Sequence, residues 1–422
     1  MIKGNTVWTV GSGGVLLLNG SRAPLIKGVV YSPTPIGGTY DFEPHGDFYL
    51  GGEGAPSYFQ WKPWWQPDVD AMAEAGVNSI RTYSWFMWMP TADNMTAAKN
   101  GGPMPEIVRD HTQFLDYCQS KDIFVLMGVG WNPDDFPLKT ANRNNGFKEF
   151  YIENCRALAK KYGKHPAVLG LVLGNEVDNA STFKDDDNYQ QYLAIMNGCA
   201  DAAAEGFKGN KIILPAFHDN PFAYGNEDAD GTPAMKKHVQ KDLSKNFTAT
   251  GINTYRGPNG ILPQEYKKFL IDGQKIERPL LITEWGSPYS MRKDGQGAEI
   301  SGELVTSHGN WVRACWKQFS DSASFPFLAG GYYFEWTDEW WKAPQLPEGK
   351  QRGQHIFNPA SSKNGAFPGG YNDEAWFGVM GVEVSENRDP LKYWDDSKNG
   401  PVSPDKRIKR NTYNVLQEIF TQ

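Results

Sequence analysis

The sequence predicts an α/β fold, namely a (β/α)8 TIM barrel with a short N-terminal β-hairpin and long βα loops. Eight short apolar segments alternate with segments of helical periodicity, which is typical of a parallel barrel. Two of the eight, at 168–173 and 278–284, lead to a glutamate at the carboxyl end, Glu176 and Glu284. A doubly wound open sheet is the alternative, but no glycine-rich nucleotide loop follows the first predicted strand.

The predicted elements follow one another in a regular order. Residues 1–22 alternate polar and apolar side chains around Gly11–Gly14, which predicts a hairpin that caps the bottom of the barrel. Residues 23–422 are expected to form one barrel with a long insertion at about 337–406. Its strands are predicted at 24–31, 77–83, 123–129, 168–173, 211–216, 249–255, 278–284 and 328–336.

Helices are expected between these strands, and their ends carry the usual signals. The segment 67–76 has Pro67 in its first turn and Gly76 at its end. The other helices are predicted at about 110–121, 147–162, 187–205, 234–243, 263–271, 307–319 and 407–420. The apolar run 168–173 is continuous, as expected for a strand that is buried on both faces.

Composition excludes several classes of function. With 22% charged residues, a net charge of −7 and a pI near 5.6, the chain is a poor partner for nucleic acid. Its four cysteines are far apart without a CxxC pair, and its seven histidines form no HxH or HExxH motif, so neither a metal site nor a cofactor is expected. The apolar run 14–18 is too short for a membrane span or a secretory signal. Secretion or a periplasmic location after signal removal is slightly favoured over the cytoplasm, and the oligomeric state stays open.

Two glutamates are the candidate catalytic residues. Active sites of such barrels lie at the carboxyl ends of the strands, which places Glu176 after the fourth strand and Glu284 at the seventh, facing each other. Glycosidic bond cleavage uses one carboxylic acid as proton donor, and a second carboxylate that attacks the sugar or activates water. Either glutamate alone could be a helix-start residue or an ion-pair partner. Both together, at these two strands, favour catalysis.

The same mouth of the barrel holds candidate substrate-binding residues. Loops 32–66, 87–108 and 337–406 would form its walls, and their tryptophans and tyrosines suit a sugar. Arg81 could simply pair with a nearby acid, and His218 could equally be a loop histidine. Asp338 and Glu339 could bind sugar hydroxyls or merely stiffen the loop. The acidic run 184–188 fits a helix N-terminus better than a calcium loop. The candidate substrate-binding residues are Arg81, Tyr83, Trp131, Asn175, His218, Tyr255, Trp336 and Asp338.

These motifs resemble a known group of enzymes. Asn175-Glu176 after an apolar strand, with Glu284-Trp285-Gly286, is similar to glycoside hydrolase clan A, whose retaining barrels carry catalytic glutamates on strands four and seven. Segments 168–179, 77–83 (VNSIRTY) and 330–334 (GGYYF) resemble family 72 β-1,3-glucanosyltransferases. Segment 334–341 (FEWTDEWW) also resembles bacterial barrels of families 2 and 5.

The resemblance implies a role for each matching residue. Glu176 would be the acid/base and Glu284 the nucleophile, which Arg81 and Tyr255 would orient. Asn175 would contact the 2-hydroxyl of the sugar, and Trp336 would form the floor of the subsite. The Glu-Trp-Gly motif and the absence of a cysteine-rich tail depart from the transferases and favour hydrolysis.

The sequence therefore predicts a retaining β-glycoside hydrolase that acts on a β-glucan-like polysaccharide or oligosaccharide by double displacement. Two alternatives stay open. One is a β-glucan transglycosylase that uses the same two glutamates. The other is a carbohydrate-binding barrel without catalysis, although such a protein has no need of two carboxylates at catalytic positions.

Overall fold

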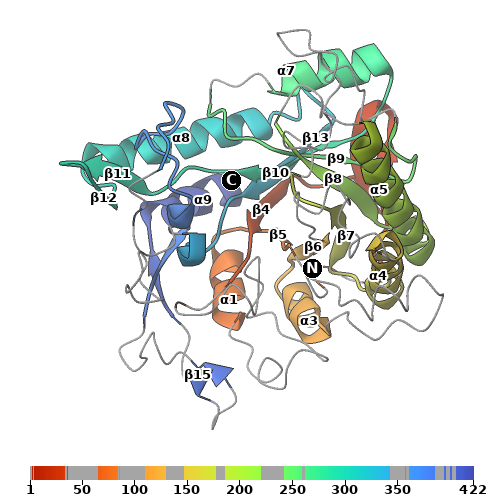
Figure 1. The fold of residues 1–422 in the computed structure, drawn as a ribbon, viewed down its shortest axis with the longest axis horizontal. Coiled ribbons are helices and arrows are strands. Elements are labelled where there is room, and N and C mark those ends of the chain that lie inside the picture. The colour runs from red at the N-terminus through yellow and green to blue at the C-terminus, as the bar shows by residue number, and fades with distance from the viewer. Residues whose placement is uncertain are drawn as a thin grey trace.

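Eight parallel strands close into a barrel, as the sequence predicts (Figure 1). Around the barrel the order is β10-β13-β4-β5-β6-β7-β8-β9, so chain neighbours pair throughout, apart from the excursion between β10 and β13. The strands are β4 (Ile26–Val30), β5 (Ser79–Arg81), β6 (Phe124–Val129), β7 (Val168–Leu173), β8 (Ile212–His218), β9 (Thr250–Asn253), β10 (Leu280–Trp285) and β13 (Leu328–Tyr333). This computed structural model describes residues 2, 4–33, 36, 65–83, 85, 110–129, 147–176, 186–219, 242–258, 262–342, 357, 361–384, 394–395, 400–401 and 405–422.

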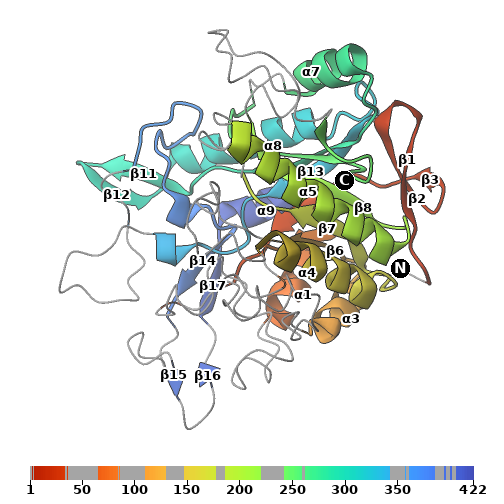
Figure 2. The same ribbon diagram turned by 45° about the vertical axis from the view of Figure 1, so that its right-hand side comes forward.

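Helices cover the outside of the barrel between successive strands (Figures 1 and 2). They are α1 (Gln66–Glu74), α3 (Thr112–Ser120), α4 (Phe147–Tyr162), α5 (Asp186–Phe207), α7 (Leu262–Tyr266) with a π-helical continuation over Lys267–Gln274, α8 (Glu303–Phe319) and α9 (Asn411–Thr421). The helix predicted at 234–243 lies almost wholly outside the described residues. In the part of the chain that is described, no helix is both long and apolar enough to cross a lipid bilayer.

The N-terminal hairpin carries a short third strand and packs against one end of the barrel. Its strands are β1 (Trp8–Gly11), β2 (Val15–Leu18) and β3 (Ser21–Arg22), all antiparallel. The buried Trp8 ring lies edge-on to Phe124 at the start of β6, with 4.9 Å between ring centroids. The Trp8 amide donates to the Asn210 carbonyl, just before β8. The hairpin therefore contacts the N-terminal ends of the strands.

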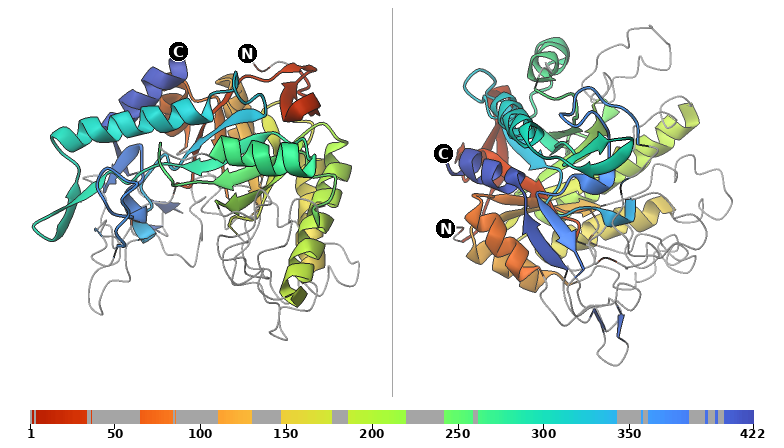
Figure 3. Two further views of the ribbon diagram at one scale, coloured as in Figure 1. Left: turned by 90° about the horizontal axis from the view of Figure 1, so that it is seen from above. Right: turned by 90° about the vertical axis from the view of Figure 1, so that its left-hand side faces the viewer.

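Outside the barrel and the N-terminal hairpin, the described residues form three further pairs of strands (Figure 3). A hairpin of β11 (Ser290–Lys293) and β12 (Gln296–Glu299) follows β10, and the sequence analysis did not anticipate it. Strand β14 (Met380–Glu383) pairs antiparallel with β17 (Lys406–Lys409). The helix predicted to start at 407 therefore starts at Asn411 instead, because residues 407–409 are committed to this pairing. The short strands β15 (Trp394–Asp395) and β16 (Gly400–Pro401) form a further pair.

The barrel interior is filled by side chains rather than open. Tyr332 of β13 is fully buried and its hydroxyl lies 2.9 Å from the Ser79 hydroxyl of β5. Gly28 of β4 leaves the room that this ring needs, since a Cβ atom there would lie 2.3 Å from the ring. The interior is therefore a packed core, and any substrate must bind at the mouth.

Candidate active site

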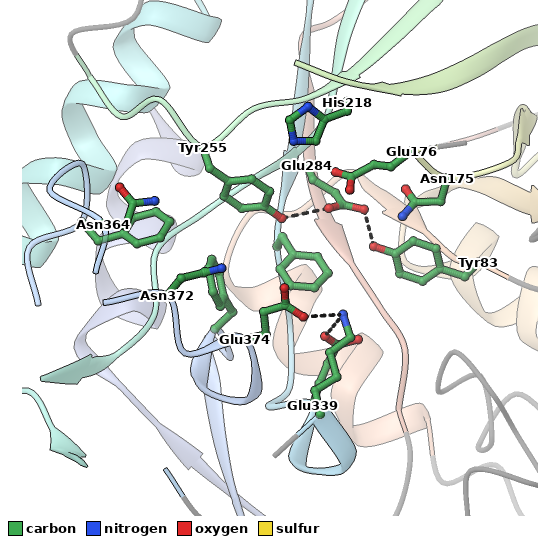
Figure 4. Close-up of a pocket in the computed structure, with 14 residues that line it drawn as sticks. Tyr83, Asn175, Glu176, His218, Tyr255, Glu284, Glu339, Asn364, Asn372 and Glu374 are labelled. Carbon is green, nitrogen blue, oxygen red and sulfur yellow. Dashed lines mark hydrogen bonds and ion pairs between the residues drawn. The ribbon is translucent and has the colours of Figure 1, made fainter. Parts of the chain in front are cut away.

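Three hydrogen-bond donors hold the carboxylate of Glu284, which lies near the end of β10 and is 4% exposed (Figure 4). Arg81 Nη1 and the Tyr83 hydroxyl donate to Oε1, at 2.9 Å and 2.5 Å. The Tyr255 hydroxyl donates to Oε2 at 2.8 Å. Burial, followed by the charge of Glu284, raises the pKa of both tyrosines well above the usual value, so both hydroxyls keep their protons and donate. Glu284 is thus fixed in one orientation.

The guanidinium of Arg81 links this carboxylate to the fourth strand. Arg81 ends β5 and is fully buried. Besides Glu284, its Nη1 donates to the Thr283 carbonyl at 2.7 Å, and its Nη2 donates to Asn175 Oδ1 at 2.8 Å. A planar guanidinium can satisfy several acceptors in a fixed geometry, which a lysine could not reproduce. Arg81 therefore sets the relative positions of residues from β7 and β10.

Glu176 occupies a different environment from Glu284. It follows β7 in a left-handed backbone conformation with φ of 51°, after Gly174 with φ of 68°. Burial raises the pKa of Glu176, and the negative charge of Glu284 raises it further, against the opposing effect of His218. Asn253 Nδ2 donates to Glu176 Oε1 at 3.0 Å. Glu176 has a raised pKa, whereas Glu284 is held by a cation. Such unlike environments allow one glutamate to act as an acid and the other as a nucleophile.

Asn253 is a site residue that the sequence analysis missed. It ends β9 and is 1% exposed. Its Nδ2 donates to Asn175 Oδ1 at 3.0 Å as well as to Glu176, and its Oδ1 accepts from Thr283 Oγ1 at 2.7 Å. The signal was its place at the carboxyl end of a predicted strand, two residues before Tyr255. Asn253 therefore links Glu176 by hydrogen bonds to Thr283, the residue before Glu284.

A cavity of about 390 Å³ opens above these groups (Figure 4). One part of its lining is aromatic, and another is polar and charged. Burial raises the pKa of Glu339 to about 7, although Lys342 opposes this. The described lining residues are Tyr83, Asn175, Glu176, His218, Tyr255, Glu284, Phe334, Glu339, Lys342, Asn364, Phe367, Asn372, Glu374 and Phe377. Of the described lining residues after Phe334, Glu339 was considered in the sequence analysis together with Asp338. The others were not anticipated, because they come from the long excursion after β13.

Six of the ten predicted site residues line this cavity, namely Tyr83, Asn175, Glu176, His218, Tyr255 and Glu284. Arg81 lies beneath it and contacts Glu284, while Trp131 is outside the described residues.

Two of the predicted substrate-binding residues lie elsewhere, and their predicted positions at the cavity are corrected. Trp336 is fully buried and its ring packs against Tyr413, 6.1 Å between centroids, so it is not part of the described lining. Phe334, two residues earlier, lines the cavity instead. Asp338 is 1% exposed and forms an ion pair with Arg410 at 2.7 Å, so it stabilises the loop. In both cases the chain after β13 turns these side chains into the protein.

A second cavity of about 370 Å³ adjoins the first and shares Lys342, Asn372 and Glu374 with it. Its lining also includes Ser361, Ser362 and the ion-paired Asp373. Across the described ranges, no three or more His, Cys, Asp and Glu side chains are grouped so that they could bind a metal ion.

Comparison with solved structures finds the same barrel fold in β-glucuronidases. No protein-family model and no curated protein sequence matches the chain. The β-glucuronidase of Bacteroides uniformis matches 89% of this chain and 35% of its own, at 15% identity and a TM-score of 0.51. That of Ruminococcus gnavus matches 98% of this chain and 53% of its own, at 12% identity and a TM-score of 0.54.

The same Ruminococcus enzyme in complex with D-glucaro 1,5-lactone matches with the same TM-score of 0.54. The chain thus spans 35% of the length of the Bacteroides enzyme and 53% of that of the Ruminococcus enzyme. At identities this low, the comparisons show that this chain shares the barrel fold of these enzymes.

Proposed function

We propose that this protein is a retaining β-glycoside hydrolase in which Glu284 is the nucleophile and Glu176 the acid/base. One observation carries the proposal: the carboxylate of Glu284 is held by Arg81, Tyr83 and Tyr255 in the same cavity as Glu176, whose pKa is raised. The fold that the chain shares with β-glucuronidases supports it. The substrate that we propose is a β-glucan-like oligosaccharide or polysaccharide.

In the first step, Glu284 attacks the anomeric carbon while Glu176 donates its proton to the departing glycosidic oxygen. Arg81 and the two tyrosine hydroxyls keep the attacking oxygen in place, so little reorganisation is needed when the bond forms. The raised pKa of Glu176 leaves it protonated nearer neutral pH than an ordinary glutamate, as a general acid requires.

In the second step, Glu176 removes a proton from water, which attacks the glycosyl–enzyme ester and releases Glu284. The pKa of Glu176 falls once the charge of Glu284 is lost in the ester, because that charge is one of the causes that raise it. The same residue thus serves as an acid before the ester forms and as a base afterwards.

Two structural roles complete the proposal. Asn175, whose Oδ1 accepts from Arg81 and Asn253, has an amide group that we assign to a sugar hydroxyl. We also propose that residues 1–22 cap the barrel, which the contacts of Trp8 with the strand starts support, and that 23–422 form one catalytic unit.

A panel of 4-nitrophenyl β-glycosides and β-glucan oligosaccharides tests the function. We expect hydrolysis of at least one member, and a loss of about 10⁴-fold or more in kcat for Glu284→Ala and for Glu176→Ala with substrates of poor leaving groups. Glu383→Gln, at the exposed end of β14, is the control and should retain wild-type rates. Binding of sugars without cleavage of any would contradict the proposal and favour a carbohydrate-binding barrel.

A further inference from the structure

Carboxylates dominate the charged part of the cavity. Four glutamates line it, and among the described lining residues Lys342 is the one permanent cation. In the view of Figure 4, Glu339 and Glu374 lie together on one side of the cavity and Glu176 on the other. With Glu176 protonated for catalysis and Glu284 paired with Arg81 beneath the cavity, Glu339 and Glu374 face one ammonium group, which leaves an excess of negative charge when Glu339 is ionised.

Lys342 is already occupied by two of these acids. Its Nζ lies 2.6 Å from Glu339 Oε2 and 3.5 Å from Glu374 Oε2. The same ammonium group lies over the Phe334 ring, 5.4 Å from the centroid. An anionic substrate would have to compete with both carboxylates for this charge, whereas a sugar hydroxyl can donate to their free oxygens without displacing either.

We propose that this cavity selects β-glycosides of neutral sugars and rejects those of uronic acids. The inference rests on the proposed hydrolytic function and specifies its substrate class. A uronate would add a negative charge to a partly buried site that is already negative, where like charges repel strongly. The β-glucuronidases that share the fold would then differ from this protein in the charge of the sugar that they accept.

The cavity wall explains why a shared fold does not require a shared substrate. Glu339, Lys342 and Glu374 come from the chain that follows β13, not from the barrel strands. Residues on such loops vary while the strands keep the catalytic groups in place. The carboxylates that set the charge of the cavity are therefore separable from the pair that carries out the chemistry.

Matched pairs of 4-nitrophenyl glycosides provide the test: β-D-glucoside with β-D-glucuronide, and β-D-galactoside with β-D-galacturonide. The pair used is the one whose neutral glycoside is cleaved faster than the other neutral glycoside. In that pair we expect kcat/KM for the neutral glycoside to exceed kcat/KM for the uronide by roughly 100-fold or more. Raising the ionic strength should improve cleavage of the uronide and leave the neutral glycoside unchanged, because salt screens the repulsion.

Isosteric variants distinguish repulsion from a simple steric preference. Glu374→Gln removes one negative charge and should reduce the preference by roughly 5- to 10-fold through faster uronide cleavage. Lys342→Gln removes the cation and should enlarge the preference. Glu383→Gln, which is exposed on β14 and is not one of the lining residues, is the matched control and should leave the ratio unchanged.

Three results would overturn the inference. Uronide cleavage at an equal or higher rate than that of the neutral partner would refute it while leaving hydrolysis intact. An unchanged or larger preference for the neutral sugar in Glu374→Gln would show that the carboxylates do not repel the uronate. If no glycoside of either charge is cleaved or bound, the proposed function fails and the inference fails with it.

Discussion

Arg81 and Glu284 form a buried ion pair, with 2.9 Å between Nη1 and Oε1. The side chain of Arg81 is 0% exposed and that of Glu284 is 6% exposed, so water screens this pair little. Arg81 also donates to the Thr283 carbonyl and to Asn175, which leaves it no freedom to follow the carboxylate elsewhere. The pair therefore holds a charged oxygen at one point of the cavity.

Replacing Arg81 with methionine should impair catalysis and stability together. Removing one partner of a buried ion pair leaves the other charge uncompensated, which typically costs about 3–5 kcal/mol. We expect a fall in kcat of about 10²-fold or more, because the orientation of Glu284 is lost. Steady-state kinetics and urea unfolding measure the two effects. The control, Arg313→Met, breaks an exposed ion pair with Glu418 and should change the free energy of unfolding by about 0–1 kcal/mol. A fully active Arg81→Met protein would contradict the assigned role.

Removing the hydroxyl of Tyr255 or Tyr83 should lower kcat without unfolding the protein. Each donates one hydrogen bond to Glu284, and loss of one well-placed donor typically reduces kcat by about 10²- to 10³-fold. Tyr255→Phe and Tyr83→Phe are compared with Tyr117→Phe, whose hydroxyl bonds Asp70 at the surface. Unchanged rates in both site variants would show that the hydroxyls do not support the nucleophile.

The protonation of Glu176 should respond to the charge of Glu284. Burial raises the pKa of Glu176 and the charge of Glu284 raises it further, so Glu284→Gln should lower it. Carbon-13 NMR of labelled glutamate measures this pKa directly in both proteins. In the active enzyme, kcat/KM should fall as pH rises through the pKa of Glu176, since the acid is active when protonated. A pKa that is the same in the wild type and in Glu284→Gln would contradict the coupling.

Asp338 and Arg410 tie the loop after β13 to the start of α9. Arg410 donates to Asp338 at 2.7 Å and 2.8 Å and to the Gly378 carbonyl at 2.9 Å, and it also pairs with Glu299. Arg410→Met should therefore reduce the free energy of unfolding by about 3–5 kcal/mol. Urea unfolding measures the loss, with Arg313→Met as the exposed control. A loss no larger than that of the control would mean that this network does not hold the loop.

The fold could be predicted from the sequence because each barrel strand is a short apolar run between recognisable helix signals. Val168–Leu173 is apolar throughout because it is buried on both faces. Residues 407–409 misled the helix prediction, since their pairing partner lies at 380–383, a distant contact that local periodicity does not report. The β11–β12 hairpin was missed because it interrupts the alternation of strands and helices.

The two glutamates could be predicted because the ends of parallel strands meet at one rim. The wall formed by Glu339, Lys342 and Glu374 could not, because it depends on how a long excursion folds back over the mouth. Trp336 and Asp338 lie in the same stretch as Glu339, yet two point into the core and one into the cavity. Without the backbone path after β13, the sequence does not distinguish these orientations.

Covalent trapping tests the central claim most directly. The protein is incubated with 2-deoxy-2-fluoro β-glycosides that carry a good leaving group, in the sugar series that it hydrolyses. The substituent slows both steps, and the good leaving group lets the ester accumulate. The account predicts a mass increase of one fluoroglycosyl unit, located by peptide mass spectrometry at Glu284 and absent in Glu284→Gln. A label on another residue, or hydrolysis with inversion of the anomeric configuration and no label, would contradict it.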